Sequence, residues 1–123
     1  MDSEQIRAQP GIQERSFGFA LRILKVVRAL GRDAACQAIA RQIARSGTSI
    51  GANVEEAQGA HSKVDFTRRM NIARAEALET RYWLKLIAAA GLLPKGRLAP
   101  LIQEADELVR ILVAIVKKSR GVE

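Results

Sequence analysis

Two glutamates on predicted helices are the first residues of this sequence that could do chemistry together. Glu56 and Glu79 are carboxylates, and such a pair could act as a general acid and a general base. The alternative is a partly buried network of ion pairs and hydrogen bonds that fixes helix register, because buried charges demand partners. No set of nucleophile, base and orienting group can be assembled without a usable histidine, so we predict no catalytic residue. We assign the following side chains to a structural polar network: Arg41, Arg45, Asn53, Glu56 and Glu79.

The single histidine and the single cysteine limit metal and redox chemistry. No Cys/His cluster exists to hold zinc, and we predict no metal site and no cofactor. His61 falls in a predicted hairpin loop, where a lone histidine is typically solvated. Cys36 lies near the start of a predicted helix, whose dipole could lower the pKa of the thiol. Its small apolar neighbours favour a second interpretation, a small buried hydrophobic side chain.

The stretch RQIARSGTSIGANVEEAQGAHSKVDF, from Arg41 to Phe66, holds two glycines among small polar residues and allows two interpretations. It could be a flexible loop that cradles a phosphate, or a helix with one very small face. A P-loop needs G-x-x-x-x-G-K-[ST] after a strand, and neither that lysine nor a strand is present. Two stripes instead follow helical steps of three and four: Ile39, Ile43, Ser46, Ile50, Asn53 and Ala57, and beside them Ala40, Ala44, Gly47 and Gly51. The segment is therefore predicted to be a helix, and a neighbouring helix packed very close must offset the roughly 1 kcal/mol that each interior glycine costs.

Hydrophobic periodicity divides the rest of the chain. Residues 1–13 are predicted to be a flexible tail, and residues 14–120 one domain. Four helices are expected: one that Ser16 caps and that ends at Gly31, one from Asp33 to about Gly59, one from Ser62 to Gly91, and one over residues 98–118. Three of these show the following apolar positions: Phe17, Leu21, Leu24 and Val27 or Arg28 in the first; Phe66, Met70, Ala73, Ala77, Leu84 and Ala88 in the third; Leu101, Ala105, Leu108, Leu112, Ile115 and Val116 in the fourth. Short connections between them predict an all-α fold, an antiparallel up-down-up-down four-helix bundle.

Composition agrees with a helical, basic protein. The chain has 123 residues, of which 48% are hydrophobic but only 4% aromatic, a mixture that favours helices over strands. Its net charge of +7 indicates a basic surface, which attracts polyanionic partners. The polar N-terminal residues do not form a signal peptide, and every apolar run is interrupted before the roughly 20 residues that a membrane span needs. We expect a cytoplasmic protein without a membrane partner.

Basic side chains form two stripes on the predicted helices. The first comprises Arg74, Arg81 and Lys85; the second comprises Arg22, Lys25 and Arg28, continued by Arg32. Binding to a phosphate backbone needs only such a field of cations, without exact spacing. Few aromatic residues are interleaved for base stacking, so an ordinary solvated helix face remains the alternative. We expect the regularly spaced first stripe to be the main contact.

Three polar motifs carry a resemblance to a known family. They are Arg45, Ser49, Ile50, Asn53 and Glu56; then Ser62, Asp65 and Phe66; then Ala73 and Glu79. This pattern resembles that of the four-helix bundle proteins related to the 23S rRNA intervening-sequence protein, which include the accessory variability determinant of diversity-generating retroelements. The resemblance spans about residues 17–120. It implies a bundle that often assembles as a homopentamer, and, in the retroelement members, binding to nucleic acid and to a reverse transcriptase.

Two functions follow as hypotheses. The first is a non-enzymatic homo-oligomer, a pentamer by the resemblance, whose basic surface binds RNA or DNA without sequence specificity, with a reverse transcriptase as a further partner. The alternative is a protein-interaction scaffold without a nucleic-acid role, and an enzyme is disfavoured. Self-association is also predicted because several apolar residues remain off the chosen faces, and soluble monomers rarely expose large apolar patches. These residues are Val26, Leu78, Leu86, Ile87 and Val109.

Overall fold

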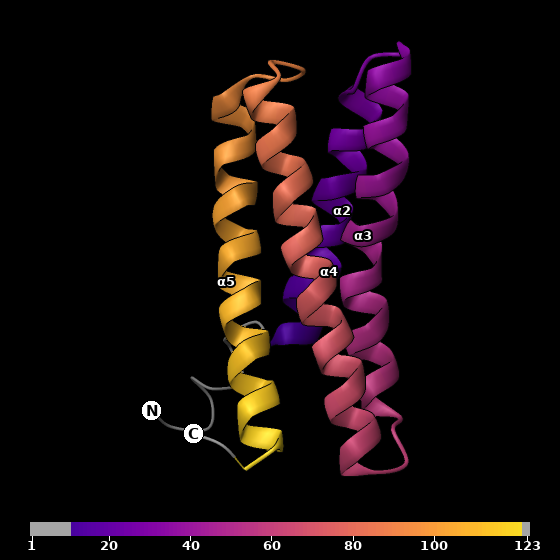
Figure 1. Cartoon of the computed structure of the whole chain (residues 1–123), viewed down its shortest axis with the longest axis vertical. Coiled ribbons are helices and arrows are strands. Elements are labelled where there is room, and N and C mark those ends of the chain that lie inside the picture. Colours follow the sequence, from indigo (N-terminus) through magenta and orange to yellow (C-terminus); the bar gives the residue numbers. More distant parts are fainter. Residues whose placement is uncertain (1–10, 122–123) are drawn as a thin grey trace.

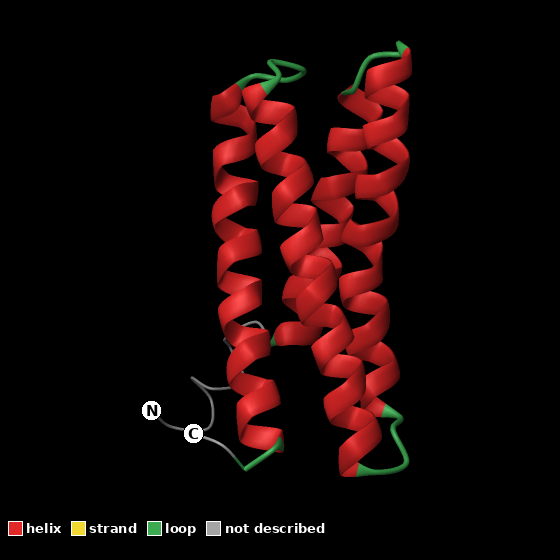
Figure 2. Ribbon diagram, in the orientation of Figure 1, coloured by secondary structure: helices red, strands yellow, loops and turns green. Residues whose placement is uncertain are grey.

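The computed structural model describes residues 11–121, and four long helices make up almost all of this range (Figure 2). They are α2 (Ile12–Ala29), α3 (Ala34–Gln58), α4 (Lys63–Ala89) and α5 (Lys95–Ser119). The predicted all-α bundle is confirmed. Residues 1–10, most of the predicted tail, lie outside the described residues, and α2 begins at Ile12, before the expected boundary at residue 14.

Successive helices run in opposite directions and lie side by side (Figure 1). α3 and α4 make the most extensive contacts, followed by α4 with α5 and α2 with α3, while α2 and α5 close the bundle with a smaller contact. Short turns join them, as an up-down-up-down topology requires. The C-terminal end of α2 therefore lies at the same end of the bundle as the start of α5.

Local capping chemistry sets most helix ends. The carboxylate of Asp33 accepts a hydrogen bond from the backbone N–H of Cys36, and the Ser62 hydroxyl accepts one from the N–H of Asp65. Gly91 follows the end of α4 with a φ of +69°, a left-handed conformation that glycine adopts without strain. Pro94 precedes α5, which begins at Lys95 and so is longer than the predicted range of 98–118.

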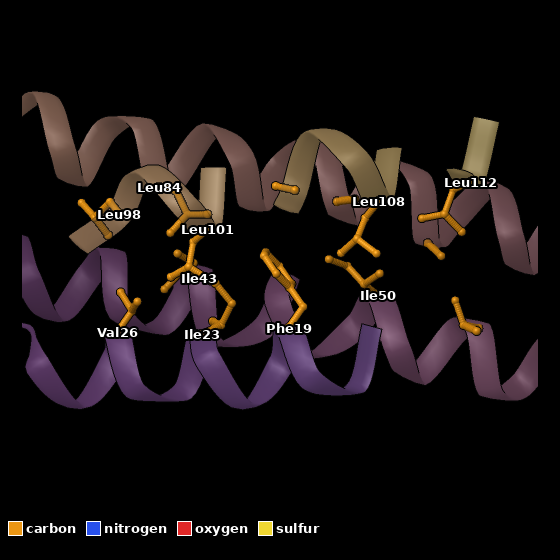
Figure 3. Close-up of a cluster of buried hydrophobic side chains, with 14 of the residues drawn as sticks. Phe19, Ile23, Val26, Ile43, Ile50, Leu84, Leu98, Leu101, Leu108 and Leu112 are labelled. Carbon is orange, nitrogen blue, oxygen red and sulfur yellow. The ribbon is translucent and has the colours of Figure 1, made fainter. Parts of the chain in front are cut away.

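The core runs the length of the bundle along the inner faces of all four helices (Figure 3). The predicted faces of the second, third and fourth helices supply it, with Ile43, Ile50, Leu84, Leu108 and Leu112 fully buried. Leucine and isoleucine side chains from opposite helices meet at the centre, where burial is worth about 1.5–3 kcal/mol for each large apolar side chain. Three of the four helices therefore bury the face that the sequence predicts.

The buried face of α2 differs from the expected one. Phe17, Leu21 and Leu24 are 66%, 51% and 41% exposed, whereas the core receives Phe19, Ile23, Val26 and Leu30. The side chain of Ser16, expected to cap the helix, is fully buried within it and donates a hydrogen bond to the carbonyl of Gln13. α2 carries two apolar stripes, and contacts with α3 decide which one is buried.

These contacts are made through the two glycines of α3. A Cβ built on Gly47 would lie 2.7 Å from Cγ2 of Ile23, and one built on Gly51 would lie 3.4 Å from Oγ of Ser16. The predicted close approach of a second helix to the bare backbone of α3 is therefore confirmed, and the neighbour is α2. Because only glycine leaves room for Ile23 at this point, the small face of α3 selects the Ile23 side of α2.

The apolar residues expected to remain exposed also need correction. Val26 and Ile87 are buried in the core, while Leu78, Leu86 and Val109 are half-buried. Among the large apolar side chains exposed within residues 11–121, Val64 and Tyr82 lie on α4. The other three, Phe17, Leu21 and Leu24, follow one face of α2 and are hereafter called the α2 apolar stripe. This stripe is therefore the surface that self-association would bury.

Candidate nucleic-acid interface

The predicted polar network is two separate clusters between α3 and α4. In the first, the Arg45 guanidinium donates to the carboxylates of Glu76, at 2.9 Å, and Glu79. The indole N–H of Trp83 also donates to Glu79, at 2.9 Å. Arg45 thus bridges two helices through a forked pair of carboxylates that are three positions apart on α4. Glu76 and Trp83 were not predicted, although the spacing of Glu76 and Glu79 indicates that they share a helix face.

The second cluster centres on Arg69 of α4. Its guanidinium forms an ion pair of 2.6 Å with Glu56 and donates a longer hydrogen bond of 3.4 Å to the side chain of Asn53. Arg41 belongs to neither cluster: it is exposed and lines a groove between α2 and α3. Glu56 and Glu79 are therefore each paired with a different arginine, and the structure does not join them in one acid/base site.

Glu79 gives a test of the first cluster through its pH dependence. The hydrogen bond from Arg45, together with that from Trp83, lowers the pKa of Glu79. A carboxylate whose pKa is lowered by folding stabilises the protein above its unfolded pKa of about 4.3, and this contribution is lost as pH falls through the folded pKa. Because Arg45 is half exposed and solvent screens the pair, we expect Glu79→Gln to cost about 1 kcal/mol or less at pH 7. Urea unfolding at pH 7 and pH 3 should show the difference from the parent shrinking at the lower pH; an undiminished difference would contradict this account.

Cys36 and His61 do not form a site in the described part of the chain. Cys36 is 3% exposed, and burial raises the pKa of its thiol, so the small-hydrophobe interpretation holds and the lowered pKa does not. His61 lies exposed in the turn before α4. Residues 11–121 contain no cluster of three or more His, Cys, Asp or Glu side chains that could bind a metal ion.

The predicted stripe of Arg74, Arg81 and Lys85 lies on α4, and its charge is partly neutralised by neighbouring side chains. Arg81 forms an ion pair of 2.7 Å with Asp106 of α5, and Arg74 donates through Nε to the side-chain oxygen of Asn71 at 2.8 Å. Lys85 is exposed. The charge of Arg81 is therefore largely balanced, and an added phosphate would have to compete with Asp106.

The second predicted basic stripe lies on α2, and its side chains are less neutralised than those of the stripe on α4. Arg22, Lys25 and Arg28 are exposed, and none of them forms an ion pair within residues 11–121. Arg22 and Lys25 line a small hollow of about 200 Å³ together with Arg97 at the start of α5. We call Arg22, Lys25 and Arg97 the α2–α5 cation cluster. Arg97 was not predicted as a site residue, because its proximity to α2 depends on closure of the bundle.

A further arginine, Arg15, links α2 to α5 at the opposite end of their contact. It forms ion pairs with Glu104 at 2.6 Å and Glu107 at 2.8 Å, and these two hydrogen-bonded carboxylates raise the pKa of Arg15. The contact joins the start of α2 to α5. Glu104 and Glu107 thus neutralise Arg15 near the start of α2. Farther along α2, Arg22 and Lys25 have no carboxylate partner within the described residues.

The fold and this surface define a class of protein, a four-helix bundle whose carboxylates mainly tie helices together and whose remaining charge is cationic. Residues 10–114 match the family described as 23S rRNA-intervening sequence protein, and the chain belongs to this family. A crystal structure of a protein of unknown function from the S23 ribosomal protein family of Bacteroides thetaiotaomicron is 34% identical and has a TM-score of 0.80; the match covers 87% of this chain and 99% of that one.

Neither of these relatives carries a description that names a catalytic activity. A search of curated proteins finds no significant match. No helix within residues 11–121 is both long and apolar enough to cross a membrane.

Proposed function

We propose that this protein is a non-enzymatic homo-oligomer whose basic surface binds RNA or DNA without sequence specificity. The observation that carries the proposal is the α2–α5 cation cluster, in which three cations from two helices converge and none is paired with a carboxylate of the described residues. Phosphate-backbone binding needs such a field of cations. Within residues 11–121 no set of side chains is arranged to read base edges, so the binding should tolerate any sequence.

Self-association is supported by the α2 apolar stripe. Its large side chains are exposed on an outer helix face, and a groove of about 280 Å³ between α2 and α3, which includes Phe17 and Gly51, runs beside it. A second copy of the chain that covered this face would remove these side chains from water. The family resemblance favours a pentamer.

The two surfaces can act together. Arg28 lies in line with the α2 apolar stripe and would fall within or beside the contact between copies. Arg22 is about 120° around the helix from Arg28 and faces Arg97, so it remains accessible in an oligomer. Each copy then adds one cation cluster, and weak attraction to a single cluster becomes multivalent.

The test compares two triple variants that remove the same charge. Arg22/Lys25/Arg97→Gln is expected to weaken binding to duplex DNA and structured RNA roughly tenfold or more at low salt, and to make the salt dependence shallower. Arg74/Arg81/Lys85→Gln, which includes the already paired Arg81, is expected to have the smaller effect. Filter binding or fluorescence anisotropy at several salt concentrations measures both, after circular dichroism and light scattering confirm intact helicity and mass.

Three outcomes distinguish the alternatives. Equal losses in the two triple variants would show that net charge alone acts, and a larger loss in the α4 variant would return the site to Arg74, Arg81 and Lys85. A parent protein without salt-sensitive binding to either polymer would favour the interaction scaffold. A reverse transcriptase partner rests on the resemblance alone, and a reverse transcriptase gene beside this one is its test.

A further inference from the structure

Two adjoining hollows lie between the start of α4 and the end of α5, remote from the α2–α5 cation cluster. The larger has a volume of about 470 Å³ and the smaller about 280 Å³. They share two residues, Asn71 and Arg120. Together they form one elongated depression of a size that suits a small molecule.

The lining of this depression is strongly cationic. It contains Lys63, Arg68, Arg74, Lys117 and Arg120, and no acidic residue. Asp65 is the nearest acid along α4, and its ion pair of 2.7 Å with Arg68 partly balances that charge. The excess positive charge of the lining therefore comes mainly from Lys63, Arg74, Lys117 and Arg120. Opposite helix ends meet here, so their dipoles partly cancel and the positive potential comes from the side chains.

The polar groups around the shared residues leave donors available. Arg74 uses Nε to donate to Asn71, so its two terminal NH₂ groups and the Asn71 amide N–H₂ can donate to a ligand. The floor is fixed by a hydrogen bond between the hydroxyls of Thr67 and Ser119, which ties α4 to α5, and by a bond of 2.8 Å from Thr67 to the carbonyl of Lys63. The scaffold beneath the cations is therefore held in place before any ligand arrives.

We propose that this depression binds the diphosphate group of a small phosphate-bearing molecule. The two hollows place Lys63 and Arg68 on one side and Arg74 and Lys117 on the other, with Arg120 common to both. Such an arrangement suits two linked phosphates, one in each hollow. Guanidinium groups match phosphate oxygens in bidentate geometry, and Val64, Val113 and Val116 supply an apolar wall for the rest of the molecule.

The same chemistry could come from the backbone of a nucleic acid, but the position favours a small ligand. The depression lies between α4 and α5, and Arg74 is the only residue that its lining shares with the two predicted basic stripes. A ligand here would leave the α2–α5 cation cluster unoccupied.

Isothermal titration with inorganic pyrophosphate at constant ionic strength tests the proposal. We expect saturable binding of one pyrophosphate per chain, tighter than that of orthophosphate. Arg120→Ala should weaken it about tenfold, because the shared cation is lost, whereas Arg110→Ala removes the same charge from an exposed position of α5 outside the lining and should leave it unchanged. Asn71→Ala should also weaken it without any change of charge.

Several results would overturn the inference. They are the absence of saturable binding, equal binding of orthophosphate, and equal losses in Arg120→Ala and Arg110→Ala, which would indicate general attraction only. Displacement of bound pyrophosphate by saturating duplex would assign the depression to nucleic acid instead. Loss of duplex binding in Arg22/Lys25/Arg97→Gln is a separate readout, so the two proposals can fail independently.

Discussion

Gly47→Leu is expected to unfold or severely destabilise this protein. Even a single added Cβ would lie 2.7 Å from Cγ2 and 3.1 Å from Cβ of Ile23, a side chain with no exposure to solvent. Leucine adds three more carbons at the same point, so α2 must move away from α3 and open the core. Overpacking of this kind costs about 1–3 kcal/mol or more, and a loss near 3 kcal/mol would lower the midpoint of thermal unfolding by roughly 10 °C.

A matched pair of alanine variants separates packing from helix propensity. Gly47→Ala and Gly18→Ala replace interior helix glycines by the same residue, and each gains roughly 0.5–1 kcal/mol of intrinsic helix stability. A Cβ on Gly18 meets nothing within 4 Å, so Gly18→Ala should raise the midpoint. Gly47→Ala should lower it, because the clash with Ile23 outweighs the gain. If Gly47→Leu left the midpoint of thermal unfolding unchanged, α2 and α3 would not pack as described.

Leu21→Glu is expected to dissociate the proposed oligomer into chains of 13.5 kDa and to abolish most nucleic-acid binding with it. Leu21 is 51% exposed at the middle of the α2 apolar stripe and contributes nothing to the buried core, so the fold should survive. A carboxylate there would have to be desolvated in the contact between copies, which is strongly unfavourable without a partner. Loss of multivalency should then weaken duplex binding by about a hundredfold or more.

Sedimentation equilibrium at micromolar concentration measures the mass, and circular dichroism checks the helix content. Ala75 is exposed on α4, away from this stripe, so Ala75→Glu adds the same carboxylate as a control that should leave the mass unchanged. A parent protein that already sediments at 13.5 kDa would exclude self-association through this face. An oligomer that persists in Leu21→Glu would place the interface elsewhere.

Features set by neighbouring residues in the chain could be predicted from the sequence. Asp33 and Ser62 cap the second and third helices as expected, since a cap depends on hydrogen bonds to backbone groups two or three residues away. The periodic stripe of α3 identified a helix where a glycine-rich loop was the alternative. Gly47 and Gly51 also predicted a closely packed neighbouring helix, because an interior glycine lowers helix stability and close packing can offset that cost.

The sequence could not determine how α2 is rotated or which charges are balanced. Periodicity shows both the stripe of Phe17, Leu21 and Leu24 and the stripe of Phe19 and Ile23, and it ranks neither. The pairing of Arg81 with Asp106, like the convergence of Arg22 and Arg97, joins helices that are distant in the chain. The formation of a helix, its cap and its small face are local properties, because each depends on residues only a few positions apart in the chain. The buried side of α2 and the net charge of each surface depend on where other helices place their backbone and side chains, and only the assembled bundle fixes those positions.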